Sequence, residues 1–225
     1  MTAVSAREGY RLWAPTYSDE TAISYLEERL VAGLTPPLGG LRLLDAGCGT
    51  GRRLRASGAG TSVGIDASVE MINAGISREG PPEQIELMVA DVRDIPLDDR
   101  SFDVVWCRLV VGHLPRLTEA YAELGRVADD RATVVVSDFH PAAHDAGHRR
   151  RFRTGREVVE LEHYVHRTED HLAAAARAGL VLNEIREAEI GNDVRSFYDD
   201  SGRGDAFAGH VGLPVVLALS FRREC

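Results

Sequence analysis

Leu43-Leu44-Asp45-Ala46-Gly47-Cys48-Gly49-Thr50-Gly51 is the stretch that decides the fold. An apolar run ends in an acid and opens into three glycines, which predicts a buried strand that runs into a loop of bare backbone. Such a loop at the carboxyl end of a first parallel strand is where doubly wound folds hold a nucleoside cofactor. The dinucleotide fingerprint G-x-G-x-x-G places its third glycine three residues after the second, whereas Gly51 follows Gly49 after two.

Strands and helices alternate along the chain on both sides of this loop. Apolar runs bounded by glycine, proline or acids predict strands at about 41–46, 61–66, 84–90, 102–107 and 132–137. Helical spacing predicts helices over about 20–33, 68–76, 116–127 and 168–178. Later strands are expected at 180–185 and 214–221, whereas 139–167 has no clean period and 191–210 is expected to be loop. The alternation predicts an α/β fold, with a doubly wound parallel sheet and helices on both faces.

Composition excludes several classes of protein. The formal net charge of −9 argues against nucleic acid as a partner, because nucleic-acid binders need a basic footprint. The absence of lysine removes Schiff-base catalysis, a pyridoxal phosphate anchor and a Walker lysine. The three cysteines are far apart, so no disulfide framework is predicted. The sequence shows neither an apolar run long enough for a membrane span nor a secretory signal, so we expect a cytoplasmic protein of one domain, 1–225, without a membrane partner.

Acids stand at the ends of three successive predicted strands. Asp45 closes the first strand, Asp66 the second and Asp91 the third. Because the carboxyl ends of parallel strands share one edge of the sheet, these carboxylates are expected to form a row there. In that row Asp66 can accept hydrogen bonds from both hydroxyls of a ribose. Asp91 can accept from an adenine amino group while Val92 donates its backbone N–H to the ring.

The order Asp45-x-Gly47-x-Gly49-x-Gly51, then Asp66, then Asp91 resembles the class I S-adenosylmethionine-dependent methyltransferases. The resemblance covers roughly residues 10–138, and it is strengthened by Val89-Ala90-Asp91 and Ser101-Phe102-Asp103-Val104-Val105. The N-terminal segment that begins Tyr10-Arg11-Leu12-Trp13 looks like the entry segment of the ubiquinone/menaquinone-type small-molecule branch.

The resemblance implies a Rossmann-like sheet of seven strands, mostly parallel, with an antiparallel last strand. It divides the chain into an N-terminal helical lid at 1–37, a cofactor-binding core at 38–138, and substrate or lid insertions at 139–167 and 190–210. The implied cofactor is S-adenosylmethionine, which becomes S-adenosylhomocysteine, and the implied partner is a small-molecule methyl acceptor.

The resemblance also implies a position for each cofactor contact. The expected contacts are Asp45, Gly47, Cys48, Gly49 and Gly51 at the methionine end, Asp66, Ala67, Met71, Asp91 and Val92 at the ribose and adenine, and Tyr17, Cys107, Arg108 and His113 beside or over the methionine moiety. Arg108 departs from the small or polar residue expected at its position. Its guanidinium is expected to pair with the methionine carboxylate or with an acidic substrate.

A general base is optional for methyl transfer, because the sulfonium carries the activation and positioning supplies much of the rate. A phenol or alcohol acceptor benefits from a base near neutral pH, and histidine is the usual choice. His140, just past the fifth strand, is our candidate for that base or for a substrate contact. His140, His144 and His148 also fall four residues apart, with more possible ligands at 162–166, but Gly147 weakens a shared helix and no metal site is predicted.

These patterns favour methyl transfer to oxygen or nitrogen of a small molecule, in a biosynthetic or tailoring role. A nucleic-acid methyltransferase is the alternative, although Cys107-Arg108-Leu109-Val110 stands where exocyclic-amine enzymes carry an Asn/Asp-Pro-Pro-aromatic motif. A nicotinamide oxidoreductase conflicts with the glycine spacing and lacks the lysine of a Tyr-x-x-x-Lys pair. A non-catalytic S-adenosylmethionine-binding protein fits the same residues. The sequence predicts neither the acceptor nor the oligomeric state.

Overall fold

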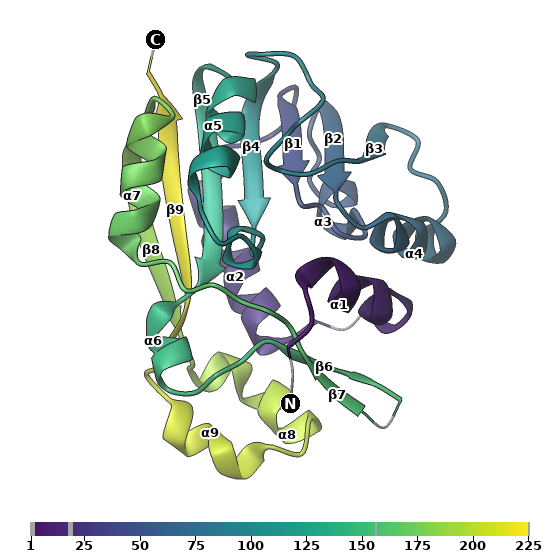
Figure 1. Ribbon diagram of the computed structural model, residues 1–225, viewed down its shortest axis with the longest axis vertical. Coiled ribbons are helices and arrows are strands. Elements are labelled where there is room, and N and C mark those ends of the chain that lie inside the picture. Colours follow the sequence, from purple (N-terminus) through teal and green to yellow (C-terminus); the bar gives the residue numbers. More distant parts are fainter. Residues whose placement is uncertain (1–2, 18–19, 156, 225) are drawn as a thin grey trace.

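A computed structural model describes residues 3–17, 20–155 and 157–224. Within these ranges seven strands form one sheet in the order β3-β2-β1-β4-β5-β9-β8 (Figure 1). The strands are β1 Arg42–Ala46, β2 Thr61–Asp66, β3 Ile85–Val89, β4 Phe102–Arg108, β5 Ala128–Phe139, β8 Leu180–Glu189 and β9 Pro214–Arg223. The strands β1 to β5 pair in parallel, whereas β9 lies antiparallel between β5 and β8. The predicted seven-stranded sheet with an antiparallel last strand is confirmed.

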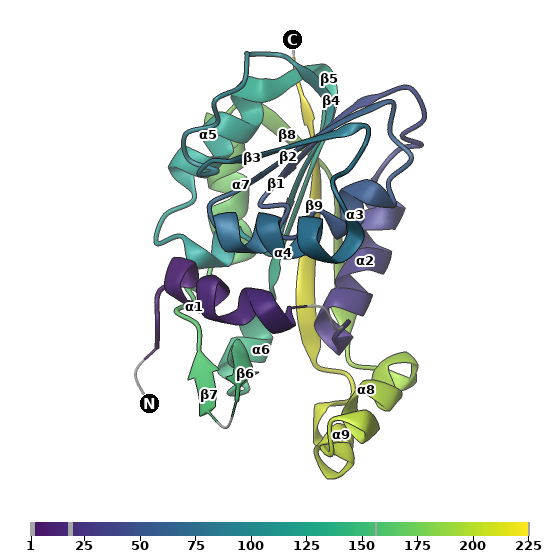
Figure 2. The same cartoon turned by 90° about the vertical axis from the view of Figure 1, so that its right-hand side faces the viewer.

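Helices cover both faces of the sheet, as the alternation predicts. Figure 2 shows α5 and α7 on one face and α2 and α3 on the other, with α4 alongside β2 and β3. The helices around the sheet are α2 Ala22–Leu34, α3 Arg52–Arg55, α4 Val69–Glu79, α5 Thr118–Val127 and α7 Thr168–Arg177. In β1 the side chain of Leu44 packs into the core beneath α5, and that of Leu43 packs into the core beneath α2. Both are fully buried, as expected for a central parallel strand.

The helix α2 begins at a capping box, which explains why the chain turns from a loop into a helix there. Thr21 Oγ1 accepts from the Ser24 N–H at 3.1 Å, and Ser24 Oγ accepts from the Thr21 N–H at 2.8 Å. This helix packs on β9 and β8, so it is one of the helices that cover the sheet. Of the predicted lid at 1–37, α1 (Ala6–Trp13) and the short helix η1 (Ala14–Thr16) lie by the carboxyl ends of β1 and β4 (Figure 1).

The segment 139–167 contains regular structure that the sequence pattern does not reveal. It holds α6 (Pro141–Asp145) and a hairpin of β6 (Arg151–Thr154) with β7 (Glu157–Glu160), beside α1 in Figure 1. His140 is the N-cap residue of α6, which ends before His148. His140, His144 and His148 therefore do not lie along one helix face.

The prediction of a loop at 191–210 is wrong. This segment forms the short helix η3 (Asn192–Val194), α8 (Arg195–Asp200) and α9 (Gly204–His210). Tyr198 and Phe207 from this unit are buried in a cluster with Phe139 and Val215. Tertiary burial thus makes helices of a glycine-rich stretch that has little helical tendency of its own.

Candidate functional site

The glycine loop after β1 is tied to the end of β2. The backbone N–H groups of Gly47 and Cys48 both donate to the Ile65 carbonyl oxygen, at 2.7 and 2.9 Å. Gly47 has φ +94°, and a Cβ added there would lie 2.1 Å from Val110 Cγ2. Only glycine therefore fits, and the loop presents bare backbone at the edge of the sheet. Gly51 also has a positive φ, and its N–H donates to the Cys48 carbonyl at 3.0 Å.

Asp45 lies directly beneath this loop and is 2% exposed. Its Oδ1 is buried and has no hydrogen-bond partner among the residues that the structure describes. Burial raises the pKa of the Asp45 carboxyl to about 6, against the attraction of Arg108 and Arg53. A buried carboxylate with a free acceptor oxygen is costly to fold, so such an atom marks a place where a ligand donor fits.

Asp66 at the end of β2 closes the other side of the loop. Its Oδ2 accepts from the Gly49 N–H and its Oδ1 from the Ser68 N–H, both at 2.8 Å. Burial raises the pKa of the Asp66 carboxyl, and these two N–H groups oppose the rise. Each oxygen keeps a second lone pair for another donor. On α4, Met71 is buried and its Cε would lie 3.3 Å from a Cβ at Gly49, whereas Ala67 is exposed.

Asp91 follows β3, but its carboxylate already has a partner. Arg93 donates to it from Nε at 2.9 Å and from Nη2 at 2.6 Å, and this guanidinium lowers the pKa of Asp91. The neighbouring Val92 is buried in the core against the α5 face. The row of strand-end acids therefore contains two carboxylates at the loop, Asp45 and Asp66, and a third that Arg93 holds at the surface.

The end of β4 differs from what the resemblance implies. The Cys107 side chain is fully buried in the core cluster, and burial raises the pKa of its thiol. Arg108 faces α2, where its Nε donates to Glu27 Oε1 at 2.9 Å and its Nη2 to Glu28 Oε2 at 2.7 Å. Ser137 and Arg53 also bind the fully buried Glu27 carboxylate. The expected pairing of Arg108 with a ligand carboxylate is thus replaced by an ion pair within the chain.

A chain of hydrogen bonds connects α1 with the segments that follow β4 and β7. Arg150 Nη2 donates to the Tyr10 hydroxyl at 3.0 Å, and this hydroxyl lies 3.1 Å from His113 Nε2. His113 Nδ1 lies 3.2 Å from the Glu162 carbonyl oxygen, so we assign its proton to Nδ1. Burial lowers the pKa of His113 to about 3 and raises that of Tyr10 to about 12. Tyr17 completes the cluster with its ring 5.9 Å from that of Tyr10.

His140 and His163 differ in how their ring nitrogens are used in the structure. His140 Nδ1 accepts from the Ala142 N–H at 3.1 Å to cap α6, and its Nε2 lies 3.4 Å from Glu187 Oε1. Both ring nitrogens of His163 are buried and have no partner among the described residues. Burial lowers the pKa of His163 to about 4. The sequence offers His163 only as a possible metal ligand. Its contact with Gly112 depends on the fold and cannot be read from the spacing of the residues.

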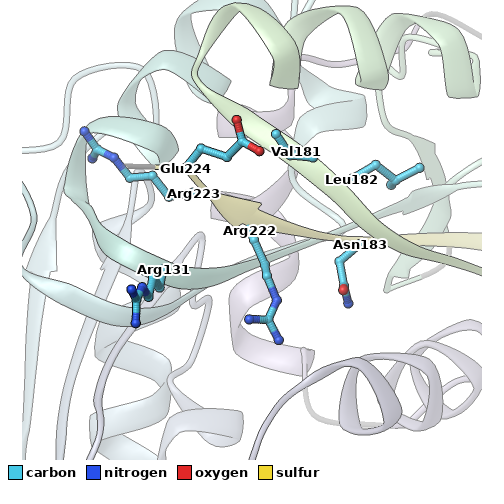
Figure 3. A pocket seen from close by; sticks show the side chains of 7 residues that line it. All are labelled: Arg131, Val181, Leu182, Asn183, Arg222, Arg223 and Glu224. Carbon is cyan, nitrogen blue, oxygen red and sulfur yellow. The ribbon is translucent and has the colours of Figure 1, made fainter.

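No three histidine, cysteine or acidic side chains in the described ranges gather where they could hold a metal ion. None of the described helices is long and apolar enough to cross a membrane. A pocket of about 470 Å³ lies where β8 begins and β9 ends (Figure 3). It is lined by Arg131, Val181, Leu182, Asn183, Arg222, Arg223 and Glu224, which include none of the predicted site residues.

Comparisons with known proteins agree with this geometry. A protein-family model described as a methyltransferase domain matches residues 44–136. The 27-O-demethylrifamycin SV methyltransferase of Amycolatopsis mediterranei is 31% identical over 152 residues, which cover 63% of this chain and 56% of that protein. The chain spans about half the length of the curated relatives it matches.

Solved structures share the fold at lower identity. An S-adenosylmethionine-dependent methyltransferase from Mesorhizobium loti superimposes with a TM-score of 0.68 at 21% identity, over 88% of this chain and 98% of that one. The [4+2]-cyclase SpnF superimposes with a TM-score of 0.67 at 19% identity, over 100% of this chain and 98% of that one. The glycine loop, Asp45 and Asp66 all lie within the matched segment 44–136. Residues 44–136 therefore match a methyltransferase domain, and the described chain has the fold of solved S-adenosylmethionine-dependent methyltransferases.

Proposed function

We propose that this protein transfers the methyl group of S-adenosylmethionine to an oxygen or nitrogen of a small-molecule acceptor, in a biosynthetic or tailoring pathway. The match of residues 44–136 to a methyltransferase domain supports the reaction. One relative is named a 27-O-demethylrifamycin SV methyltransferase, and this name supports a small acceptor and an oxygen target. The chain's net charge of −9 supports the same choice over nucleic acid.

The observation that carries the proposal is the free Oδ1 of Asp45 beneath the glycine loop. The methionine end of the cofactor bears an ammonium group, which is the donor that a buried, unpaired carboxylate oxygen needs. Gly47 and Gly49 leave backbone beside that oxygen, and Asp66 on the next strand keeps acceptor capacity for ribose hydroxyls. The residues present therefore fit S-adenosylmethionine.

The cofactor contacts follow from this placement. When bound, the sulfonium supplies an activated methyl group, and the residues of this chain hold and orient it. We assign the contacts to Tyr17, Asp45, Gly47, Cys48, Gly49, Gly51, Asp66, Ala67, Met71, Asp91, Val92 and His113. Asp91 is included through its backbone and Val92 through its N–H, since Arg93 holds the Asp91 carboxylate. Cys107 and Arg108 are not among these contacts, because Cys107 packs in the core and Arg108 is paired with Glu27 of α2.

Isothermal titration with S-adenosylmethionine and S-adenosylhomocysteine tests the cofactor, and transfer of a tritiated methyl group to small-molecule extracts tests the reaction. We expect micromolar binding of both nucleosides and label in the extract. Absence of binding below millimolar concentration would refute the proposal. Label in total RNA instead would favour the nucleic-acid alternative. Binding without transfer to any fraction would favour a non-catalytic or cyclase-type use of the fold, as the likeness to SpnF allows. Stabilisation by NADPH alone would favour an oxidoreductase.

A further inference from the structure

A second cavity, of about 190 Å³, lies between α6, the β6–β7 hairpin and the segment that follows β7. It is lined by Ala3, Phe139, His144, His148, Arg149, Arg150, Glu160, Leu161, Glu162 and His163. A cavity of about 150 Å³ in a protein core is large enough for benzene, so this one has room for a single ring with a small substituent.

Arg150 is the half-buried positive group of this cavity, whereas Arg149 is exposed and donates to the carbonyl oxygens of His144 and His148. The Arg150 guanidinium donates to the Tyr10 hydroxyl at 3.0 Å. No carboxylate in the described ranges lies within 4.0 Å of it. The acids of the lining have other partners, because Glu160 binds Arg151 Nε at 2.8 Å and Glu162 accepts from the Tyr164 hydroxyl at 2.9 Å. From beyond 4.0 Å, the buried Asp138 carboxylate attracts the guanidinium and helps to raise its pKa. A partly desolvated guanidinium with no carboxylate in direct contact is the partner that a ligand carboxylate fits, through its planar pair of donors.

His163 supplies the second unpaired group. Both of its ring nitrogens are buried without a partner in the described chain. Its ring packs edge to face with those of Phe139, at 5.6 Å, and His113, at 6.1 Å. A neutral imidazole offers one donor and one acceptor, so a polar group in the cavity would complete its hydrogen bonding. The cavity thus combines an aromatic wall, a cation and an unpaired imidazole.

The cavity is connected with the glycine loop through the segment after β4. Val110 fills the space next to Gly47, and two residues later Gly112 lies against the His163 ring, where an added Cβ would be 2.3 Å from Cε1. Tyr10 joins the two regions a second time, since its hydroxyl contacts both Arg150 and His113. A molecule in the cavity would therefore lie beside the cofactor edge of the sheet.

We propose that this cavity binds the carboxylate end of the methyl acceptor, with Arg150 as counter-ion and His163 as hydrogen-bond partner. The inference rests on the proposed function and names the acceptor class, a small carboxylic acid with a single ring. Arg150 and His163 are then specificity-determining residues. The proposal assigns them no proton transfer.

Benzoate and its neutral isostere benzamide are the probes. The wild-type protein is first titrated with S-adenosylhomocysteine, and the saturated complex is then titrated with each probe. We expect benzoate to bind at least tenfold more tightly than benzamide. Equal affinities, or no binding of benzoate up to millimolar concentration, would overturn the inference. Because the nucleoside is titrated first, failure of the proposed function appears separately, as absence of S-adenosylhomocysteine binding.

Variants then assign the preference to its residue. Arg150→Gln should abolish the tenfold difference, whereas Arg150→Lys keeps the positive charge and should retain part of it. Arg153→Gln is the matched control, because it removes an exposed arginine from β6 of the same hairpin. Its preference for benzoate should equal that of the wild type. Equal loss in the Arg150 and Arg153 variants would show general electrostatics and would refute the assignment.

Discussion

Replacing Asp45 with asparagine tests how much stability the molecule gives up to keep a carboxylate under the glycine loop. Burial raises the pKa of Asp45 to about 6, against 3.8 for an ordinary carboxyl. The folded state therefore holds the proton more tightly than the unfolded chain does. The stability that this group contributes is fully present below about pH 4 and is lost as the pH rises through about 6. Two pKa units correspond to about 3 kcal/mol, at roughly 1.4 kcal/mol for each unit.

Urea unfolding followed by circular dichroism measures this effect at several pH values. The free energy of unfolding of the wild type, minus that of Asp45→Asn, should fall by about 2.4 kcal/mol between pH 4 and pH 7, because the unfolded carboxyl is already partly ionised at pH 4. Other titrating groups, such as His113 and His163, are common to both proteins and cancel. Asp103→Asn is the control of opposite sign, because Arg42 lowers the pKa of Asp103, so its stabilisation is lost as the pH falls. A wild-type minus Asp45→Asn difference that stays flat with pH would refute the reasoning.

Three further predictions concern the loop, the buried ion pair and the cap. Gly47→Ala should abolish S-adenosylhomocysteine binding in titration, whereas Gly147→Ala, with a similar φ and open space, should cost only the ~1–2 kcal/mol of a left-handed backbone. Glu27→Gln should lower the free energy of unfolding by ~3–5 kcal/mol, and a double-mutant cycle with Arg108→Met should show strong coupling; additive losses would contradict a shared ion pair. His140→Ala should cost ~1 kcal/mol of stability, and His140→Asn should restore the cap and retain methyl transfer; loss of transfer in the asparagine variant would return His140 to the catalytic machinery.

The strands β1 to β4 could be predicted from the sequence because they are short, largely apolar and bounded by turn residues. The burial of Leu43 and Leu44 on opposite faces needs only the period of a strand. The helices α8 and α9 could not be predicted, because the burial of Tyr198 and Phe207 against distant residues stabilises them, and their own segment is rich in glycine. Local propensity loses to tertiary packing in such a segment.

Some residues of the site could likewise be predicted from the sequence, and others could not. The positions of Asp45 and Asp66 follow from strand ends, which a sequence pattern can locate. The partners of Arg108 do not, because α2 lies 80 residues earlier in the chain and supplies Glu27 and Glu28 only through the fold. His163 is likewise defined by its position against Gly112, which no spacing in the sequence records. Contacts that depend on one strand are thus predictable, and contacts that join distant segments are not.

The position of β9 has a consequence for synthesis of the protein. This strand, at residues 214–223, separates β5 from β8 and pairs with both, so neither can complete its backbone hydrogen bonds before it is made. On the ribosome, the nascent chain would carry β5 with one open edge until almost all of the described residues have emerged. Open edges of this kind recruit other strands. We therefore expect the growing polypeptide to depend on chaperones until β9 is inserted, and a stop codon just before position 214 to yield aggregates.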